Sequence, residues 1–185
     1  MKKFKNFRLK SFMVMAVAAS VFAFASCTDD DNNGGSGSSG FSANDPEGTV
    51  VRNMNKEGYG EVGIYISSPC PNYPYWNHPF IKIDVSNNFQ FVNGRIDSGI
   101  TCIGRKNGLS SITERDTASN SYSNNCAVLP GYGYVAKDCF RYENVYYGCY
   151  LRLYVDSWIK NTTNEIIGAV VKYQDNWIIR EEPAN

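Results

Sequence analysis

The chain has 185 residues, in which 18 Lys and Arg balance 18 Asp and Glu, and it contains one His. The charge becomes −5 once the basic N-terminal segment described below is removed, which argues against binding to nucleic-acid phosphates, and no CxxC or Cys/His spacing of a zinc site occurs. No nucleophile motif accompanies the one His, so the sequence predicts a protein without catalytic residues, metal or cofactor.

Residues 1–26 predict an export signal. Five basic residues precede an apolar run from Phe12 to Ala25, which leads through Ser26 to Cys27. At roughly 14 residues, this run is too short to span a bilayer comfortably. The segment resembles a bacterial lipoprotein signal, although Phe24 stands where that pattern usually has Leu. The resemblance implies cleavage before Cys27 and lipidation of that residue. An ordinary signal peptide with a chance Cys is the alternative.

Residues 27–40 predict a lipidated Cys followed by a tether. Several acyl chains on Cys27 anchor a protein firmly, whereas one chain holds only marginally. Thr28 and the three acidic residues after it resemble the surface-export signal of Bacteroidetes lipoproteins. That resemblance implies the outer membrane, facing the cell exterior, with the periplasmic face as the alternative. The rest of the segment lacks apolar side chains, which is typical of a disordered linker. Loss of the five basic residues leaves 13 Lys and Arg against 18 Asp and Glu, a net charge of −5.

Residues 41–185 predict a single β-rich domain, because alternation of apolar and polar residues dominates over any helical period. The predicted strands span residues 48–54, 61–67, 80–85, 88–97, 100–104, 127–129, 132–137, 145–159, 165–174 and 177–180. From Cys149 to Val155 every second residue is apolar, which predicts one buried face. Turns at residues 161–164 and 175–176 predict a final three-stranded meander. The predicted fold class is therefore all-β, an antiparallel sandwich or partly open barrel.

A loop rich in proline and aromatic residues is the candidate ligand-binding site. Four prolines stiffen residues 69–79, which carry Tyr73, Tyr75, Trp76 and His78. Rigid, exposed aromatic side chains offer flat platforms for sugar rings or for a protein partner. In the alternative interpretation, Trp76 and one Tyr cap the core, and the prolines only route the chain.

Five cysteines remain after Cys27, an odd number for an exported chain: Cys70, Cys102, Cys126, Cys139 and Cys149. At least one of them is therefore unpaired or pairs outside the chain. Cys126 and Cys139 flank a predicted strand, and Cys139 and Cys149 flank a predicted hairpin loop. A bridge within either pair is the candidate disulfide, while buried thiols in the core also fit the sequence.

Two further residues carry a local prediction. Asp116-Thr117-Ala118 resembles the short O-glycosylation sequon of exported Bacteroidetes proteins, which implies a glycan on Thr117 in an accessible polar stretch. Gly168 lies inside an apolar strand pattern. A glycine at such a position predicts a bulge or the close approach of another backbone.

Several segments resemble a family of Bacteroides lipoproteins classed as a domain of unknown function. The matching segments are residues 44–49, 108–113, 130–137 (PGYGYVAK) and 166–174 (IIGAVVKYQ). The resemblance covers most of residues 44–174. It implies a β-rich domain at the outer surface or in the periplasm, and it brings no catalytic residues.

Together these patterns predict a cell-surface lipoprotein that acts as a non-enzymatic binding module. Its expected partners are the membrane, through the lipid on Cys27, and a glycan or a host or partner protein. The alternative is a structural or interaction subunit of an outer-membrane assembly without a small-molecule ligand. A small hydrolase is the third candidate, because the domain contains carboxylates, although nothing in the sequence brings two of them together.

Overall fold

The chain folds into two antiparallel β-sheets. A computed structural model describes residues 42–67, 79–95, 97–115, 121–142 and 144–182. The strands are β1 (Val50–Asn55), β2 (Ile64–Tyr65), β3 (Phe80–Ile83), β4 (Asn88–Val92), β5 (Gly99–Arg105), β6 (Asn125–Ala127), β7 (Tyr132–Tyr142), β8 (Val145–Lys160) and β9 (Ile166–Glu182). The long sheet has the order β1-β9-β8-β7-β5, and the short sheet has the order β2-β3-β4-β6. Within the described ranges the helical element is the short 3-10 turn η2 (Leu109–Ser111), and no helix there could span a membrane.

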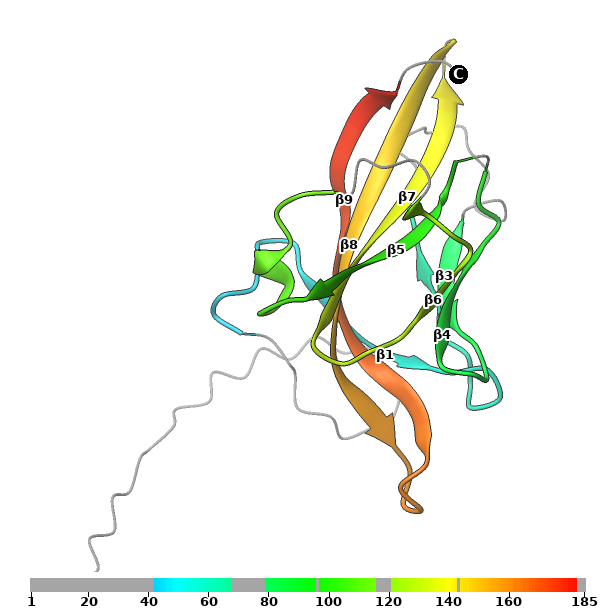
Figure 1. Cartoon of the computed structure of the whole chain (residues 1–185), viewed down its shortest axis with the longest axis vertical. Helices are drawn as coiled ribbons and strands as arrows, with labels where there is room; N and C mark the ends of the chain where they lie inside the picture. Colours follow the sequence, from blue (N-terminus) through cyan, green and yellow to red (C-terminus); the bar gives the residue numbers. More distant parts are fainter. Residues whose placement is uncertain (1–41, 68–78, 96, 116–120, 143, 183–185) are drawn as a thin grey trace, which may run out of the picture. The chain divides into compact units, whose positions relative to one another are not determined.

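The two sheets pack face to face as a sandwich (Figure 1). Strands β3, β4 and β6 lie on one side of the long strands β7, β8 and β9, and η2 lies on the other side. At each edge one isolated bridge ties the sheets together, between Lys56 and Ile83 at one edge and between Ile100 and Ser123 at the other. The sheets thus approach each other at both edges without closing into a barrel. The predicted all-β antiparallel sandwich is confirmed.

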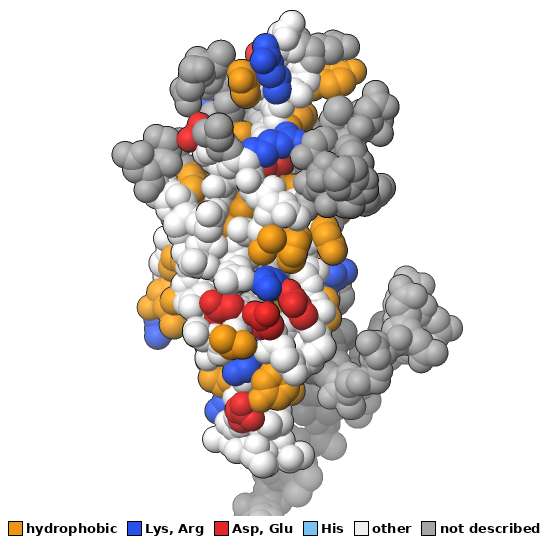
Figure 2. Space-filling model, turned by 90° about the vertical axis from the view of Figure 1, so that its right-hand side faces the viewer, with side chains coloured by type: hydrophobic (Ala, Val, Ile, Leu, Met, Phe, Trp, Pro, Cys, Tyr) orange, Lys and Arg blue, Asp and Glu red, His pale blue; other side chains and the backbone are white. Residues whose placement is uncertain are grey.

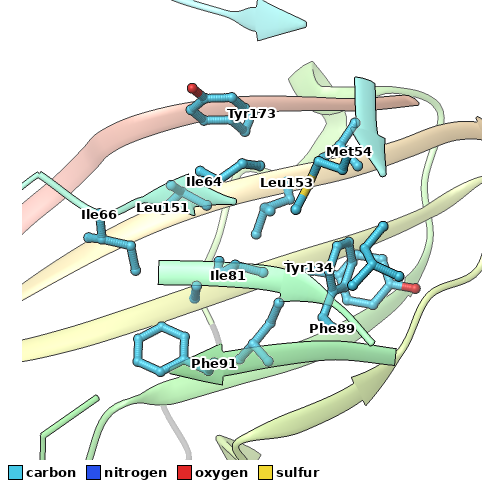
Figure 3. Packing of buried hydrophobic residues seen from close by; sticks show 14 of the residues in the cluster. Met54, Ile64, Ile66, Ile81, Phe89, Phe91, Tyr134, Leu151, Leu153 and Tyr173 are labelled. Atoms are coloured by element: carbon cyan, nitrogen blue, oxygen red, sulfur yellow. The ribbon is translucent and has the colours of Figure 1, made fainter. Parts of the chain in front are cut away.

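One apolar core fills the space between the sheets (Figure 3). Leu151 and Leu153 of β8 pack in a single cluster with Ile81 of the short sheet. The ring of Phe89 meets that of Tyr134 edge to face, with 5.0 Å between the ring centroids. Burying one such large side chain stabilises the fold by about 1.5–3 kcal/mol. The alternation predicted from Cys149 to Val155 is confirmed, because every apolar residue of that pattern lies in the core.

The opposite face of the long sheet is also covered, although the sequence pattern predicted only one buried face. Two segments, residues 42–49 and 106–115, lie across it and are held by polar side chains of the sheet. Lys172 Nζ lies 2.8 Å from the Asp45 carboxylate, and both side chains are at least nine-tenths buried. Gln174 Nε2 donates to the Glu47 carbonyl at 2.9 Å. This face of the long sheet is therefore covered by segments that are distant in sequence from the strands they contact.

The C-terminal meander consists of β7, β8 and β9, and so differs from the strands predicted for it. Strand β9 continues through Asp175 and Asn176, where the sequence predicted a turn. The register shifts there, because Tyr150 pairs with Ile178 whereas Arg152 pairs with Gln174. Asn176 has a φ of 49°. Asn tolerates this left-handed conformation, so the same residues suit a bulge as well as a turn.

Gly168 lies where the backbone of β1 approaches β9 closely. A Cβ atom at this position would lie 2.3 Å from the Met54 carbonyl oxygen, a distance that no side chain could tolerate. Asn55 is its partner in the register. The close backbone approach predicted for this glycine is confirmed.

Candidate functional site

The outward face of the short sheet carries an exposed aromatic surface. Because β3 buries Ile81 and Ile83, the alternate residues Phe80 and Lys82 face outward. Tyr65, Phe80 and Val92 oppose one another across three strands and share this face. The Tyr65 side chain is 58% exposed, and its ring centroid lies 5.5 Å from that of Phe80. We refer to Tyr65, Phe80 and Val92 as the platform.

The platform lies where the predicted ligand-binding loop leaves and rejoins the sheet. Strand β2 ends at Tyr65 and β3 begins at Phe80, and Ile66 N donates to the Pro79 carbonyl at 3.0 Å. The loop is therefore the β2–β3 connection, and its two ends lie side by side beside the platform. Its candidate ligand-binding residues lie outside the described residues: Tyr73, Tyr75, Trp76 and His78.

Polar side chains border the platform. Lys82 lies on the same face, opposite Gln90, and its Nζ lies 3.7 Å from a Glu57 carboxylate oxygen and 3.4 Å from one of Glu61. Figure 2, which views the molecule from this side, shows hydrophobic side chains next to a group of acidic and basic ones. The two carboxylates are partly exposed, at 49% for Glu57 and 37% for Glu61, whereas Lys82 is mostly covered, and ion pairs near the surface stabilise a fold by about 0–1 kcal/mol. Their charged groups therefore stay available to a ligand that rests on the aromatic rings.

A second surface feature is a shallow hollow of about 340 Å3 beside β5. It is lined by Cys102, Ile103, Lys106, Thr113, Glu114 and Arg115. Arg115 donates a hydrogen bond to the Tyr150 hydroxyl, and its guanidinium carbon lies 4.6 Å from the centroid of the Tyr150 ring. Ligand pockets are usually lined mainly by apolar side chains. The open, charged hollow is thus a weaker candidate than the platform.

The buried carboxylate of Asp138 supports the fold. Asp138 is 2% exposed, and its carboxylate accepts a hydrogen bond of 3.0 Å from Ser98 Oγ. Burial raises the pKa of Asp138, while the nearby Arg95 charge and the hydrogen bond from Ser98 act in the opposite direction. Ser98 Oγ in turn accepts from Cys139 N at 3.0 Å. These contacts hold the segment after β4 onto β7 and give the carboxylate a structural role.

No disulfide joins any two of the cysteines that the structure describes, which are Cys102, Cys126, Cys139 and Cys149. Neither bridge expected from the sequence is therefore formed. Phe140 and Cys149 belong to the core, so Cys139, next to Phe140 on β7, faces the opposite side of the sheet from Cys149. Two Cβ atoms that point apart cannot be bridged without backbone movement. The thiol that Cys126 contacts belongs to Cys102 rather than to Cys139.

The remaining site predictions concern residues outside the described ranges, namely Cys27 and Thr117. Within those ranges, no group of three or more His, Cys, Asp or Glu side chains lies close enough together to hold a metal ion. The sequence analysis missed Tyr65 and Phe80. The signal for them was the alternation of isoleucine with an aromatic residue in Ile64-Tyr65-Ile66, which places Tyr65 on the face opposite the core.

Comparison with known proteins gives no significant match to a protein family, to a curated protein or to a solved structure. The function must therefore be inferred from the chain's own residues.

Proposed function

We propose that this chain is a non-enzymatic binding module that takes a glycan or a partner protein on the platform. We further propose that lipid on Cys27 holds it at the outer membrane, facing the cell exterior. The observation that carries the proposal is the exposure of Tyr65 beside the half-buried ring of Phe80, on a sheet whose isoleucines and remaining phenylalanines are buried. Single exposed apolar residues are common, but here Tyr65 continues into the half-buried Phe80 and Val92, and an apolar row over three strands is typical of a contact surface.

The chemistry of the platform suits a ligand with an apolar face and polar edges. An aromatic ring presents a large, rigid contact area at low entropic cost, and the Lys82 ammonium and Gln90 amide beside it can bond to hydroxyl or carbonyl groups. A sugar ring has such an apolar face and hydroxyl edge, and a protein surface can supply an equivalent pair of groups. The β2–β3 connection brings Trp76 and two further tyrosines into the same stretch of chain.

A glycan array followed by titration tests this function. The full chain is compared with its Tyr65→Ala and Trp76→Ala variants, and with Tyr142→Ala as the matched control. Tyr142 is 39% exposed at the end of β7 in the other sheet. Truncating a central aromatic contact costs about 2 kcal/mol, so we expect saturable binding that weakens roughly 30-fold in Tyr65→Ala and remains unchanged in Tyr142→Ala.

If no glycan binds, crosslinking on intact cells separates the remaining possibilities. A partner protein that is captured by the wild-type chain and lost with Tyr65→Ala supports the binding module with a protein ligand. Stable co-purification with a membrane complex that Tyr65→Ala leaves intact would instead favour a structural subunit of an outer-membrane assembly, and would contradict the proposal.

A further inference from the structure

We propose that Cys102 and Cys126 form a disulfide that joins the two sheets along one edge of the sandwich. Cys102 lies in β5, the last strand of the long sheet, and Cys126 lies in β6, the last strand of the short sheet. The chain segments at this edge are already in contact, because Ile100 N donates to the Ser123 carbonyl at 2.8 Å and Ser123 N donates back at 3.1 Å. The two strand edges therefore lie side by side.

The strand registers place both cysteines on the sides of their sheets that face each other, at the open edge of the sandwich, where Cys102 is exposed and Cys126 is half-buried. Cys102 is paired with Tyr134 on β7, and Cys126 is paired with Phe89 on β4. Paired residues of antiparallel strands share a face, so each Cys points to the same side as its aromatic partner. Both aromatic residues belong to the core, and their rings touch. The neighbouring Cys102 accordingly contributes, after burial, to the raised pKa of the Cys126 thiol.

A buried hydroxyl holds β6 in position beside the pair. The Tyr134 hydroxyl donates to the Ala127 carbonyl at 2.8 Å and accepts from Leu129 N at 2.8 Å. These two hydrogen bonds fix the chain directly after Cys126. Burial is the main cause that raises the pKa of Tyr134, and charge on Cys102 or Cys126 raises it further, because both sulfurs lie nearby. The residue that pairs with Cys102 thus also holds the chain that follows Cys126.

Bridge formation is a thiol–disulfide exchange with a disulfide-bearing oxidant of the exported compartment. Cys102 is exposed, so its thiolate attacks one sulfur of the oxidant, breaks the oxidant S–S bond and releases the first oxidant thiol. Burial, together with the neighbouring Cys102, raises the pKa of the Cys126 thiol to about 11. Cys126 therefore makes the second attack, on the Cys102 sulfur of the mixed disulfide, and expels the second oxidant thiol. The two cysteines lose two electrons and two protons, and the oxidant disulfide is reduced to two thiols.

The bridge adds a covalent link at the edge where Ile100 and Ser123 already exchange two backbone hydrogen bonds. It also encloses residues 102–126, which include residues 106–115, one of the two segments that cover the outward face of the long sheet. Cross-linking a loop of this length restricts the unfolded chain and so stabilises the folded state. Cys149, by contrast, is a buried core thiol whose pKa is raised to about 12, chiefly by burial, which is typical of an unreactive cysteine.

Tryptic peptide mapping tests the proposal without ambiguity. Cleavage after Lys and Arg places Cys102 in the peptide 96–105 and Cys126 in the peptide 116–137, while the other cysteines of the domain fall in peptides 57–82, 138–141 and 142–152. The full chain is produced by export and extracted without reductant, and a second sample is oxidised with oxidised glutathione. Both are alkylated under denaturing conditions and digested. We expect peptides 96–105 and 116–137 to be recovered as one disulfide-linked species.

Variants provide the second measurement. Cys102→Ser, at an exposed position, should unfold about 10 °C below the oxidised wild-type chain, and reduction should lower the midpoint of the wild-type chain by the same amount. Cys139→Ser, the matched control, should retain the linked peptides. Alkylation of both Cys102 and Cys126 in both samples, or linkage of either one to a different cysteine, overturns the proposal. A Cys102→Ser variant with the same unfolding midpoint as the oxidised wild-type chain also overturns it.

Discussion

Replacing Arg152 by Ala should release the segment 106–115 from the long sheet. Arg152 is 8% exposed on β8, and its Nη1 donates to the Ile112 carbonyl at 2.5 Å and to the Leu109 carbonyl at 3.4 Å. Its Nε donates to Gln174 Oε1 at 2.9 Å, and its guanidinium carbon lies 4.9 Å from the centroid of the Trp177 ring. Burial lowers the pKa of this guanidinium, which nevertheless stays charged because arginine deprotonates only at very high pH.

The expected magnitude follows from the partners that the substitution leaves behind. The substitution removes the hydrogen-bond donor of two buried carbonyl groups, and leaving each one unsatisfied costs about 1–3 kcal/mol. Loss of the stacked cation adds about 0.5–2 kcal/mol. Partial entry of water offsets some of this cost, so we expect Arg152→Ala to lower the free energy of unfolding by about 3–4 kcal/mol.

Urea denaturation measures this loss, and amide hydrogen exchange over residues 107–115 locates it. Arg105→Ala is the matched control, because Arg105 is exposed and stacks on Tyr132 at 5.7 Å from the ring centroid. The control should change the free energy of unfolding by less than about 0.5 kcal/mol. An Arg152→Ala protein within about 1 kcal/mol of wild type, with unchanged exchange in the segment, would refute the reasoning.

Three further predictions concern single side chains. Asp45→Asn should lower the free energy of unfolding by about 3 kcal/mol in urea denaturation, because it leaves the Lys172 ammonium buried without its carboxylate partner; a loss below about 1 kcal/mol contradicts this role. Gly168→Ala should cost at least about 2 kcal/mol by the same assay, because its Cβ would meet the Met54 carbonyl, and wild-type stability in this variant would show that β1 does not pack there. The raised pKa of Asp138 means that the folded state binds the Asp138 proton more tightly than the unfolded chain does. The stability gained from this proton is complete below the ordinary aspartate pKa of about 3.9, and it is lost as pH rises through the folded pKa. Asp138→Asn should remove that loss from a series of unfolding midpoints across acidic pH, and an identical pH dependence in the variant would contradict the assignment.

The sequence predicted the inner half of the sandwich well, because alternation is a local signal. The apolar positions between Cys149 and Val155 belong to the core as predicted, and the turn at Asn161 forms as expected, with Asn161 Oδ1 accepting from Glu165 N at 2.9 Å. The burial of Arg152 had no such signal. Its cover comes from residues about 40 positions earlier in the chain, and a polar residue on an alternating strand is normally expected to face water.

The difference at Asp175 and Asn176 has a related cause. These residue types occur both in reversing turns and in bulges, and the choice depends on whether a partner strand continues alongside. Strand β8 does continue, since Tyr146 still pairs with residue 182 beyond the bulge. The turn predicted at these residues is therefore wrong: the backbone is irregular there, but the chain does not reverse, because β8 continues alongside.

The candidate site was predicted in part. The proline and aromatic composition drew attention to the β2–β3 connection, but the platform at its base depends on the pairing of Tyr65 with Phe80 and of Phe80 with Val92. The same limitation applies to Cys102 and Cys126, which are brought together only because β5 and β6 end their respective sheets on the same side. Spacing along the chain carries no information about either arrangement.

Calorimetric titration of the full chain with its best glycan or protein ligand tests the central claim most directly, with Tyr65→Ala and Tyr142→Ala measured in parallel. Our account predicts that Kd rises by at least about tenfold in Tyr65→Ala and stays at the wild-type value in Tyr142→Ala. Equal affinity of the wild-type chain and Tyr65→Ala, with both proteins folded, would contradict a binding function for the platform.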